Sequence, residues 1–185
     1  MGRIVMSGVL AVVCLAALGA AAAEEKTVMV GGAAMYPSKN IVENAMNSKD
    51  HTTLVAAVKA AGLVETLQGK GPFTVFAPTN AAFNKLPAGT VDMLLKPESA
   101  GKLKDVLTYH VVAGRHDSKE LRAWARKNGG TIALDTVSGD KLWIVLDGGK
   151  LWVRDGKGMN AGITTADVYQ SNGVIHVIDT VVMAK

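Results

Sequence analysis

One ten-residue segment, from Thr74 to Phe83, constrains the fold of this chain more than any other; it reads Thr-Val-Phe-Ala-Pro-Thr-Asn-Ala-Ala-Phe. It predicts a buried strand that ends at Pro78, because proline has no N–H to donate to a neighbouring strand. A helix follows at once, with Thr79 as the N-cap that accepts from an N–H of the first turn. The residues that define this corner are Thr74, Phe76, Pro78, Thr79, Asn80 and Phe83.

This segment resembles the first signature of the fasciclin (FAS1) domain family. Two later segments resemble the rest of that pattern: Leu-Thr-Tyr-His-Val-Val at residues 107–112, and Gly-Val-Ile-His-Val-Ile-Asp at residues 173–179. The signature residues of the last segment are Gly173, His176 and Asp179. The resemblance covers residues 38–183. It implies a bacterial, secreted, single-domain protein with a FAS1-like fold, whose family is defined by adhesion and ligand display rather than catalysis.

The first 23 residues predict a cleaved secretory signal peptide: a basic start at Arg3, an apolar run over 4–18, and Ala21-Ala22-Ala23 as the cleavage site. The run is too short for a comfortable membrane span, so the mature chain is not expected to span a membrane. Cys14 is the only cysteine, and Val13 before it does not fit a lipidation site. The mature chain therefore has no disulfide or thiolate chemistry, and we expect it to be secreted or periplasmic.

The order of predicted elements indicates an α+β domain. Helical patterns begin at Ser38, which we expect to cap the first helix, and at Thr52 or Thr53; alternating strand patterns begin at Thr131. We therefore expect N-terminal helices packed on a strand-rich β-sandwich or wedge. The predicted organisation is a signal peptide over 1–23, an N-terminal arm over 24–37 and one FAS1 domain over 38–185.

The charge and motifs exclude several function classes. Removing the peptide leaves 19 basic residues (20 − 1) against 16 acidic ones, a mild and dispersed excess that does not predict nucleic-acid binding. The sequence has no Gly-x-Ser-x-Gly, no phosphate-binding loop and no His-Glu-x-x-His. The four histidines do not follow a metal-ligand spacing. We predict no catalytic residues, no metal and no cofactor, and the protein is not expected to be an enzyme.

Tyr109 and His110 are the first candidate binding residues, with Leu107, Val111 and Val112 as aliphatic flanks. The resemblance implies the segment that animal fasciclin domains use to engage integrins. We expect a strand over 109–112, which would point Tyr109 and His110 to opposite faces. The alternative is structural: Tyr109 packs in the core, and a buried His110 ring is held by Thr79 or Asn80.

Asp167 and Val168 are the second candidate binding pair. They resemble an Asp-Ile element that animal members use with integrins, although Ala166 and Val168 replace the usual proline and isoleucine. The alternative is an aspartate solvated at the surface. The last strand, expected over 174–182, is apolar on both faces, so His176 is predicted to be a hydrogen-bonded core residue.

A predicted hairpin carries the largest aromatic group, with the turn at Gly148-Gly149. This turn places Val145 opposite Trp152 and Trp143 opposite Arg154. Core packing of both tryptophans is the expectation, whereas an exposed stripe would indicate a patch for a partner or ligand.

The preferred interpretation is a secreted or periplasmic binding and adhesion protein that contacts a protein or glycan at the cell surface or matrix. The alternative is a carrier of a lipophilic small molecule, carotenoid- or lipid-like, in an apolar groove. Flexible methionines and the richness in Ala, Val and Leu suit such a groove.

Overall fold

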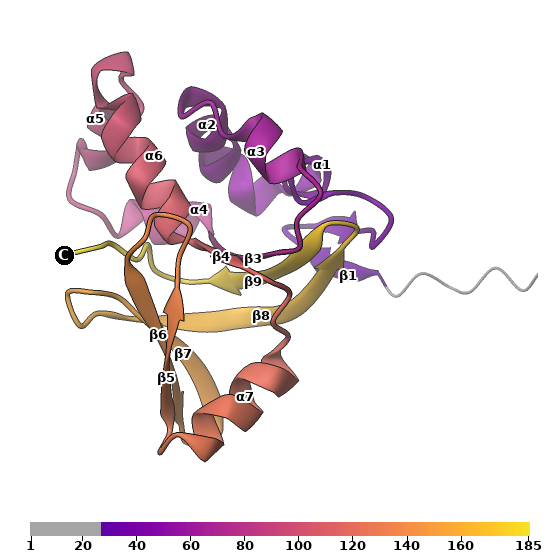
Figure 1. The fold of residues 1–185 in the computed structure, drawn as a ribbon. Coiled ribbons are helices and arrows are strands. Elements are labelled where there is room, and N and C mark those ends of the chain that lie inside the picture. Colours follow the sequence, from indigo (N-terminus) through magenta and orange to yellow (C-terminus); the bar gives the residue numbers. More distant parts are fainter. Residues whose placement is uncertain (1–26) are drawn as a thin grey trace, which may run out of the picture.

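The corner predicted around Pro78 lies at the centre of the computed structural model, which describes residues 27–185. Strand β3 (Phe73–Pro78) ends there, and helix α4 (Asn80–Asn84) follows directly. The Thr79 hydroxyl accepts a hydrogen bond from Ala82 N at 3.3 Å, so the predicted cap is confirmed. Figure 1 shows helices above the central strands, and further strands with a helix beside them below.

The central layer belongs to one seven-stranded sheet of order β4-β3-β9-β8-β7-β6-β5. Only the β3–β9 pair within it is parallel. Every residue of β9 is buried, so the predicted central, covered strand is confirmed, although it ends at Ile178 rather than residue 182. The strands are β4 (Val111–Ala113), β5 (Thr131–Asp135), β6 (Lys141–Asp147), β7 (Lys150–Arg154), β8 (Asn160–Gln170) and β9 (Gly173–Ile178).

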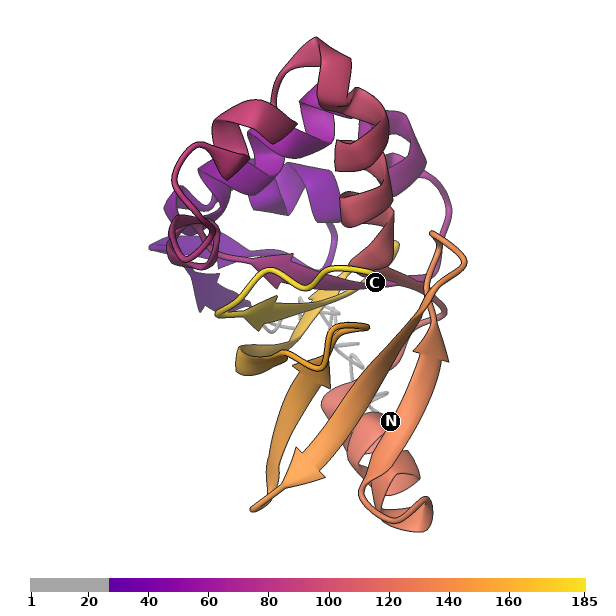
Figure 2. The same cartoon turned by 90° about the vertical axis from the view of Figure 1, so that its left-hand side faces the viewer.

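Strand β8 bends this sheet into a wedge. Its first residues, 160–162, pair with β7, whereas residues 163–170 pair with β9 through two register shifts. Such irregularities bend a strand and raise its twist. The two edge strands of the sheet, β4 and β5, also come close together. Val137 N, which follows β5, donates to Val111 O of β4 at 2.8 Å. Figure 2 shows strands β5–β7 of this sheet running downward, away from the central layer.

The interior of the wedge forms one of two cores. The inward aliphatic residues of β6 and β7 meet Phe76, Tyr109 and Ile178 there. Helix α7 (Ser118–Lys127) closes the open side with Leu121, which is completely buried. Asp117 caps this helix by accepting from Glu120 N at 2.8 Å.

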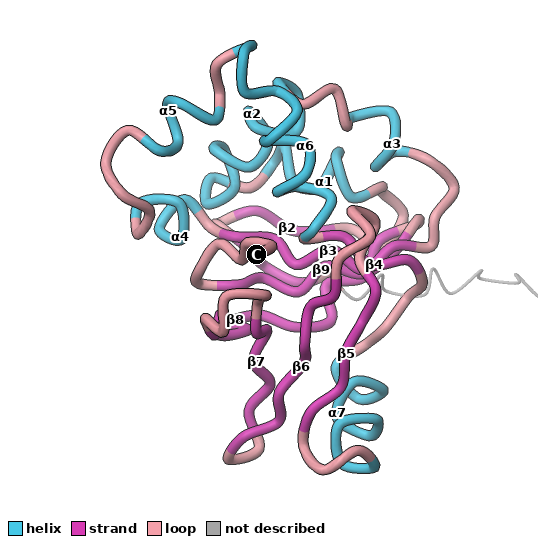
Figure 3. The backbone as a smooth tube through the Cα atoms, turned by 60° about the vertical axis from the view of Figure 1, so that its left-hand side comes forward, coloured by secondary structure: helices cyan, strands magenta, loops and turns pink. Residues whose placement is uncertain are grey.

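The second core lies between the opposite face of β3–β9 and the helices (Figure 3). Strand β3 serves both cores because successive side chains alternate: Val75 and Ala77 face the helices and Phe76 faces the wedge. The helices are α1 (Ile41–Asn47), α2 (Thr52–Ala60), α3 (Val64–Gln68), α4, α5 (Thr90–Leu94) and α6 (Ala100–Tyr109), with 3-10 turns at Lys49–His51 and Pro97–Ser99.

The N-terminal part differs from expectation. The described part of the expected arm forms a hairpin of β1 (Val28–Val30) and β2 (Ala33–Met35), and its Val30 and Met35 join the helical core. Asn40, not Ser38, caps α1, and it does so in a capping box with Glu43. Helix α2 follows directly on the 3-10 turn, and neither Thr52 nor Thr53 caps its N-terminus with a side-chain hydrogen bond. The predicted signal peptide and Cys14 lie outside the described residues.

The predicted start of the strand at residue 109 is also wrong. Tyr109 ends helix α6 and His110 follows as its C-cap, so the strand begins at Val111 rather than Tyr109. The helix persists because Leu103 and Leu107 lie one turn apart and are both buried. The α+β class and the helices-on-wedge arrangement are nevertheless confirmed.

Candidate binding surfaces

The His110 ring is buried and held by backbone groups. Its Nδ1–H donates to Val106 O at 2.7 Å, and Nε2 accepts from Val182 N at 3.2 Å. Burial lowers the pKa of His110 to about 4, against the opposing effect of the hydrogen bond to Val106. The expected side-chain contact with Thr79 or Asn80 is therefore wrong. The first two signature segments meet instead through the backbone, where Phe76 N donates to His110 O at 2.9 Å.

Tyr109 is a core residue as well. Its hydroxyl donates to Lys141 O at 2.7 Å and accepts from Gly156 N at 3.0 Å, which joins α6 to two parts of the wedge. Burial raises the pKa of this hydroxyl. Leu107, Tyr109, His110 and Val111 are each at most 5% exposed. A role for this segment in contacting a partner stays a prediction, and these side chains contribute mainly to the interior.

Asp167 ties β8 to the start of α7. Its carboxylate accepts from Ser118 N at 2.6 Å and from the Ser118 hydroxyl at 2.5 Å. Asp167 has φ 60°, the only positive φ among the described non-glycine residues, and such a conformation is uncommon outside glycine. Val168 beside it is 1% exposed. The Asp167 side chain is partly exposed and is also bonded within the fold. A contact role for it stays a prediction.

His176 has the core role predicted for it. Its Nε2–H donates to His116 O at 2.9 Å, and Nδ1 accepts from Asp167 N at 3.4 Å. The ring stacks on Phe76 with 5.7 Å between centroids, and burial lowers its pKa. Within residues 27–185, no three His, Cys, Asp or Glu side chains are grouped so that they could hold a metal ion.

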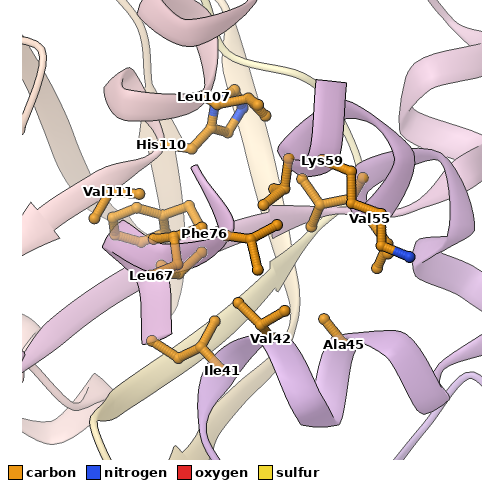
Figure 4. Close-up of a pocket in the computed structure, with 14 residues that line it drawn as sticks. Ile41, Val42, Ala45, Val55, Lys59, Leu67, Phe76, Leu107, His110 and Val111 are labelled. Atoms are coloured by element: carbon orange, nitrogen blue, oxygen red, sulfur yellow. The ribbon is translucent and has the colours of Figure 1, made fainter. Parts of the chain in front are cut away.

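An apolar groove lies between the helices (Figure 4). Val42 of α1, Val55 of α2 and Leu67 of α3 face Leu107 of α6 across it. Its cavity measures about 40 Å³, and a second apolar cavity of about 20 Å³ shares several of its lining residues. The lining of the larger cavity is almost wholly aliphatic and contains no methionine. Among the methionines, Met35 lines the smaller cavity, whereas Met29, Met46, Met93 and Met159 are more than half exposed.

The outer face of strands β5–β7, on the side away from the wedge interior, is the second candidate surface. Cross-strand pairing confirms the predicted register: Val145 lies opposite Trp152, and Trp143 lies opposite Arg154. Expected core packing of the tryptophans is wrong, because both are only partly buried while their strand neighbours point inward. The inward residues are Leu142, Ile144, Leu151 and Val153. The outward residues form the rows Thr131–Val145–Trp152–Gly162 and Ala133–Trp143–Arg154–Asn160.

A groove of about 380 Å³ crosses this outer face. Val145 and Trp152 contribute its apolar part, and Asp147, Arg154 and Asn160 contribute its polar part. The sequence alone does not predict this groove, because Gly129-Gly130 and the strands that border it come together only in the folded sheet. The available signal was the alternation itself, which separates both tryptophans from the four aliphatic residues of the hairpin.

Comparison with known proteins agrees with the geometry. The family model for the fasciclin domain matches residues 49–184 of this chain. The chain belongs to the fasciclin domain family. Protein sll1483 of Synechocystis is 46% identical over 159 residues, which cover 86% of this chain and 81% of that protein. The cell surface glycolipoprotein MPB83 of Mycobacterium bovis is 35% identical over 159 residues, or 83% of this chain and 63% of that protein.

The fold of this fasciclin domain also matches a solved FAS1 domain pair from the insect cell adhesion molecule Fasciclin I. The TM-score is 0.70 at 20% identity, over 80% of this chain and 52% of that chain. The predicted FAS1-like fold is thereby confirmed. Fasciclin is a non-enzymatic adhesion domain family, and MPB83 is a cell-surface protein by name. Among the helices of residues 27–185, none combines the length and the hydrophobicity that a membrane-spanning helix needs.

Proposed function

We propose that this fasciclin domain acts outside the cytoplasm as a non-enzymatic contact protein at the cell surface or matrix. The single observation that supports this most is the partly exposed tryptophan face of β6 and β7. Aromatic residues are enriched where proteins contact partners, because they bury a large area with few rotatable bonds. The signature segments supply the frame that holds this face, and their own side chains are mostly buried.

The test is sedimentation of the purified mature chain with isolated cell envelopes of its host. Val145→Lys places a charge in the middle of the outer face and should weaken saturable binding by about tenfold, a loss typical of a central contact residue. Met93→Lys is the matched control, because Met93 is 61% exposed on α5, away from this face. Binding that does not saturate, or that Val145→Lys leaves unchanged, would contradict the proposal.

A second candidate, a carrier of a lipophilic molecule, is supported by the groove between α1, α2, α3 and α6. Its aliphatic lining suits a carotenoid- or lipid-like ligand. A cavity of about 40 Å³ has room for only a few water-sized molecules, since one water needs roughly 10–15 Å³. A carrier would therefore have to separate α6 from α1 and α2 to admit such a ligand.

Native mass spectrometry of protein purified from its host tests the carrier function. A carrier would show a bound mass that organic solvent extracts. Ala45→Phe fills the groove and should remove that mass, whereas Ala56→Phe on the exposed side of α2 should not. A single unliganded mass for the wild-type protein would reject this candidate.

A further inference from the structure

The groove on the outer face of β5–β8 has the features of a small-ligand site, and a ligand role for it rests on the contact function proposed for this face. Its floor is rigid, because the strands that carry Val145 and Trp152 are fixed from behind by Ile144 and Val153, both completely buried. Groups held on packed strands are positioned before a ligand arrives, which lowers the entropic cost of binding.

Trp152 provides an aromatic platform in this groove. Its cross-strand partner is Gly162, and a Cβ placed on that glycine would lie 3.3 Å from Trp152 Cζ3. The indole therefore extends across β8 over the space that glycine leaves empty, rather than standing straight out from the sheet. Trp152 lines the groove and is partly exposed, so a flat apolar ligand surface can stack on the exposed part of its ring.

Polar groups of both kinds surround this platform. Arg154 Nε donates to Asn160 Oδ1 at 2.9 Å, and no other described residue bonds its Nη atoms. These N–H groups are donors, whereas the Asp147 carboxylate on the same groove is an acceptor. A sugar hydroxyl both donates and accepts, so a hexose finds partners for its hydroxyls around the rim and an apolar platform for its C–H face.

Charge and size narrow the ligand class further. Among the described residues that line the groove, the single positive group, Arg154, is balanced by Asp147, so the groove does not select for a polyanion such as a nucleic acid. A volume of about 380 Å³ is near the lower end of ligand sites, which run from roughly 300 to 1,000 Å³. We propose that this groove binds one or two units of a neutral, pyranose-based glycan, with the sugar face stacked on Trp152.

The experiment titrates the mature protein with chitotetraose, cellotetraose, maltotetraose and laminaritetraose while NMR follows the indole N–H signals. The chain has three tryptophans, and Trp→Phe variants assign their signals. At least one tetrasaccharide should shift the Trp152 signal saturably and leave that of Trp124 on α7 in place. Calorimetric titration, which does not depend on the Trp152 signal, should show that Trp152→Ala and Arg154→Ala each weaken binding by about tenfold. Tyr36→Ala is the matched control, since Tyr36 is 39% exposed and lies outside the groove.

Two results would overturn the inference: no saturable shift with any tetrasaccharide, or equal affinity of the wild type and both groove variants. Arg154→Ala keeps the test valid if Trp152→Ala fails to fold. Results that refute the glycan proposal can be told apart from results that refute the proposed contact function. If Val145→Lys loses envelope binding and no tetrasaccharide binds, the contact face stands and its glycan ligand is wrong. If a tetrasaccharide binds at Trp152 but envelopes do not, the groove stands and the contact function is wrong.

Discussion

Replacing His110 with glutamine should change how the stability of this domain depends on pH. In the folded protein, Nε2 of His110 accepts from Val182 N, so protonation would set an N–H against an N–H inside the core. Above pH 6.5 the ring is neutral in both the folded and the unfolded chain, and its contribution is fully present. As the pH falls through 6.5, the unfolded chain binds a proton and the folded chain does not, so stability decreases down to about pH 4.

The magnitude follows from the two pKa values. The fall from 6.5 to about 4 means that His110 alone removes about 2 kcal/mol from the free energy of unfolding between pH 7 and 4.5, at ~1.36 kcal/mol per unit. Burial also lowers the pKa values of His51 and His176, which adds to the decrease in the same direction. Those contributions are common to the wild type and a His110 variant and cancel when the two are compared.

Urea unfolding at several pH values between 7 and 4.5 measures this effect. In His110→Gln the amide oxygen can accept from Val182 N and the NH₂ group can donate to Val106 O, but the side chain does not titrate. Its free energy of unfolding should therefore decrease less steeply than that of the wild type. Leu107→Ala is the control: it should lower stability by about 2–4 kcal/mol at every pH and keep the wild-type slope. Parallel curves for the wild type and His110→Gln would refute the reasoning.

Substitutions at three other positions test individual groups of hydrogen bonds by urea unfolding at neutral pH. Asn172→Ala removes three hydrogen bonds, two of them buried, that tie the β8–β9 turn to α1 and to the end of α3, and should cost about 2–4 kcal/mol. Tyr109→Phe removes the two bonds of its hydroxyl to the wedge and should cost about 1–2 kcal/mol. Asp167→Ala and Asp167→Gly both lose the tie to α7, but the glycine variant should be more stable by roughly 1 kcal/mol, because glycine adopts positive φ freely; the reverse order would contradict this account of residue 167.

Features of the fold that depend on neighbouring residues were predictable. Pro78 and Thr79 end a strand and cap a helix through their own chemistry, so the corner follows from adjacent positions. Gly148-Gly149 sets the hairpin turn, and the turn sets the pairing of Val145 with Trp152. Both were expected from the sequence, because each is decided within a short stretch of chain.

Features that depend on distant parts of the chain were not predictable. The acceptor role of His110 depends on Val182, which lies 72 positions further along. Both faces of β6 and β7 are apolar, since Trp143 and Trp152 alternate with leucine, isoleucine and valine. Local pattern therefore could not decide which face lies inside. Helix α7 decides which face of the two strands is buried, because its Leu121 packs against the aliphatic face.

The central position of the signature explains why it identifies a fold without identifying a partner. Strands β3 and β9 pair in parallel between the two cores, and Phe76 stacks on His176 where the first and last signature segments meet. A partner cannot reach these side chains without opening the domain. The surfaces that could differ between members are the groove between the helices and the outer face of β5–β8, which lie on opposite sides of this central layer. Because packed sheet separates them, a substitution such as Ala45→Phe should leave glycan binding at Trp152 unchanged, and the two binding hypotheses can be tested independently in one protein.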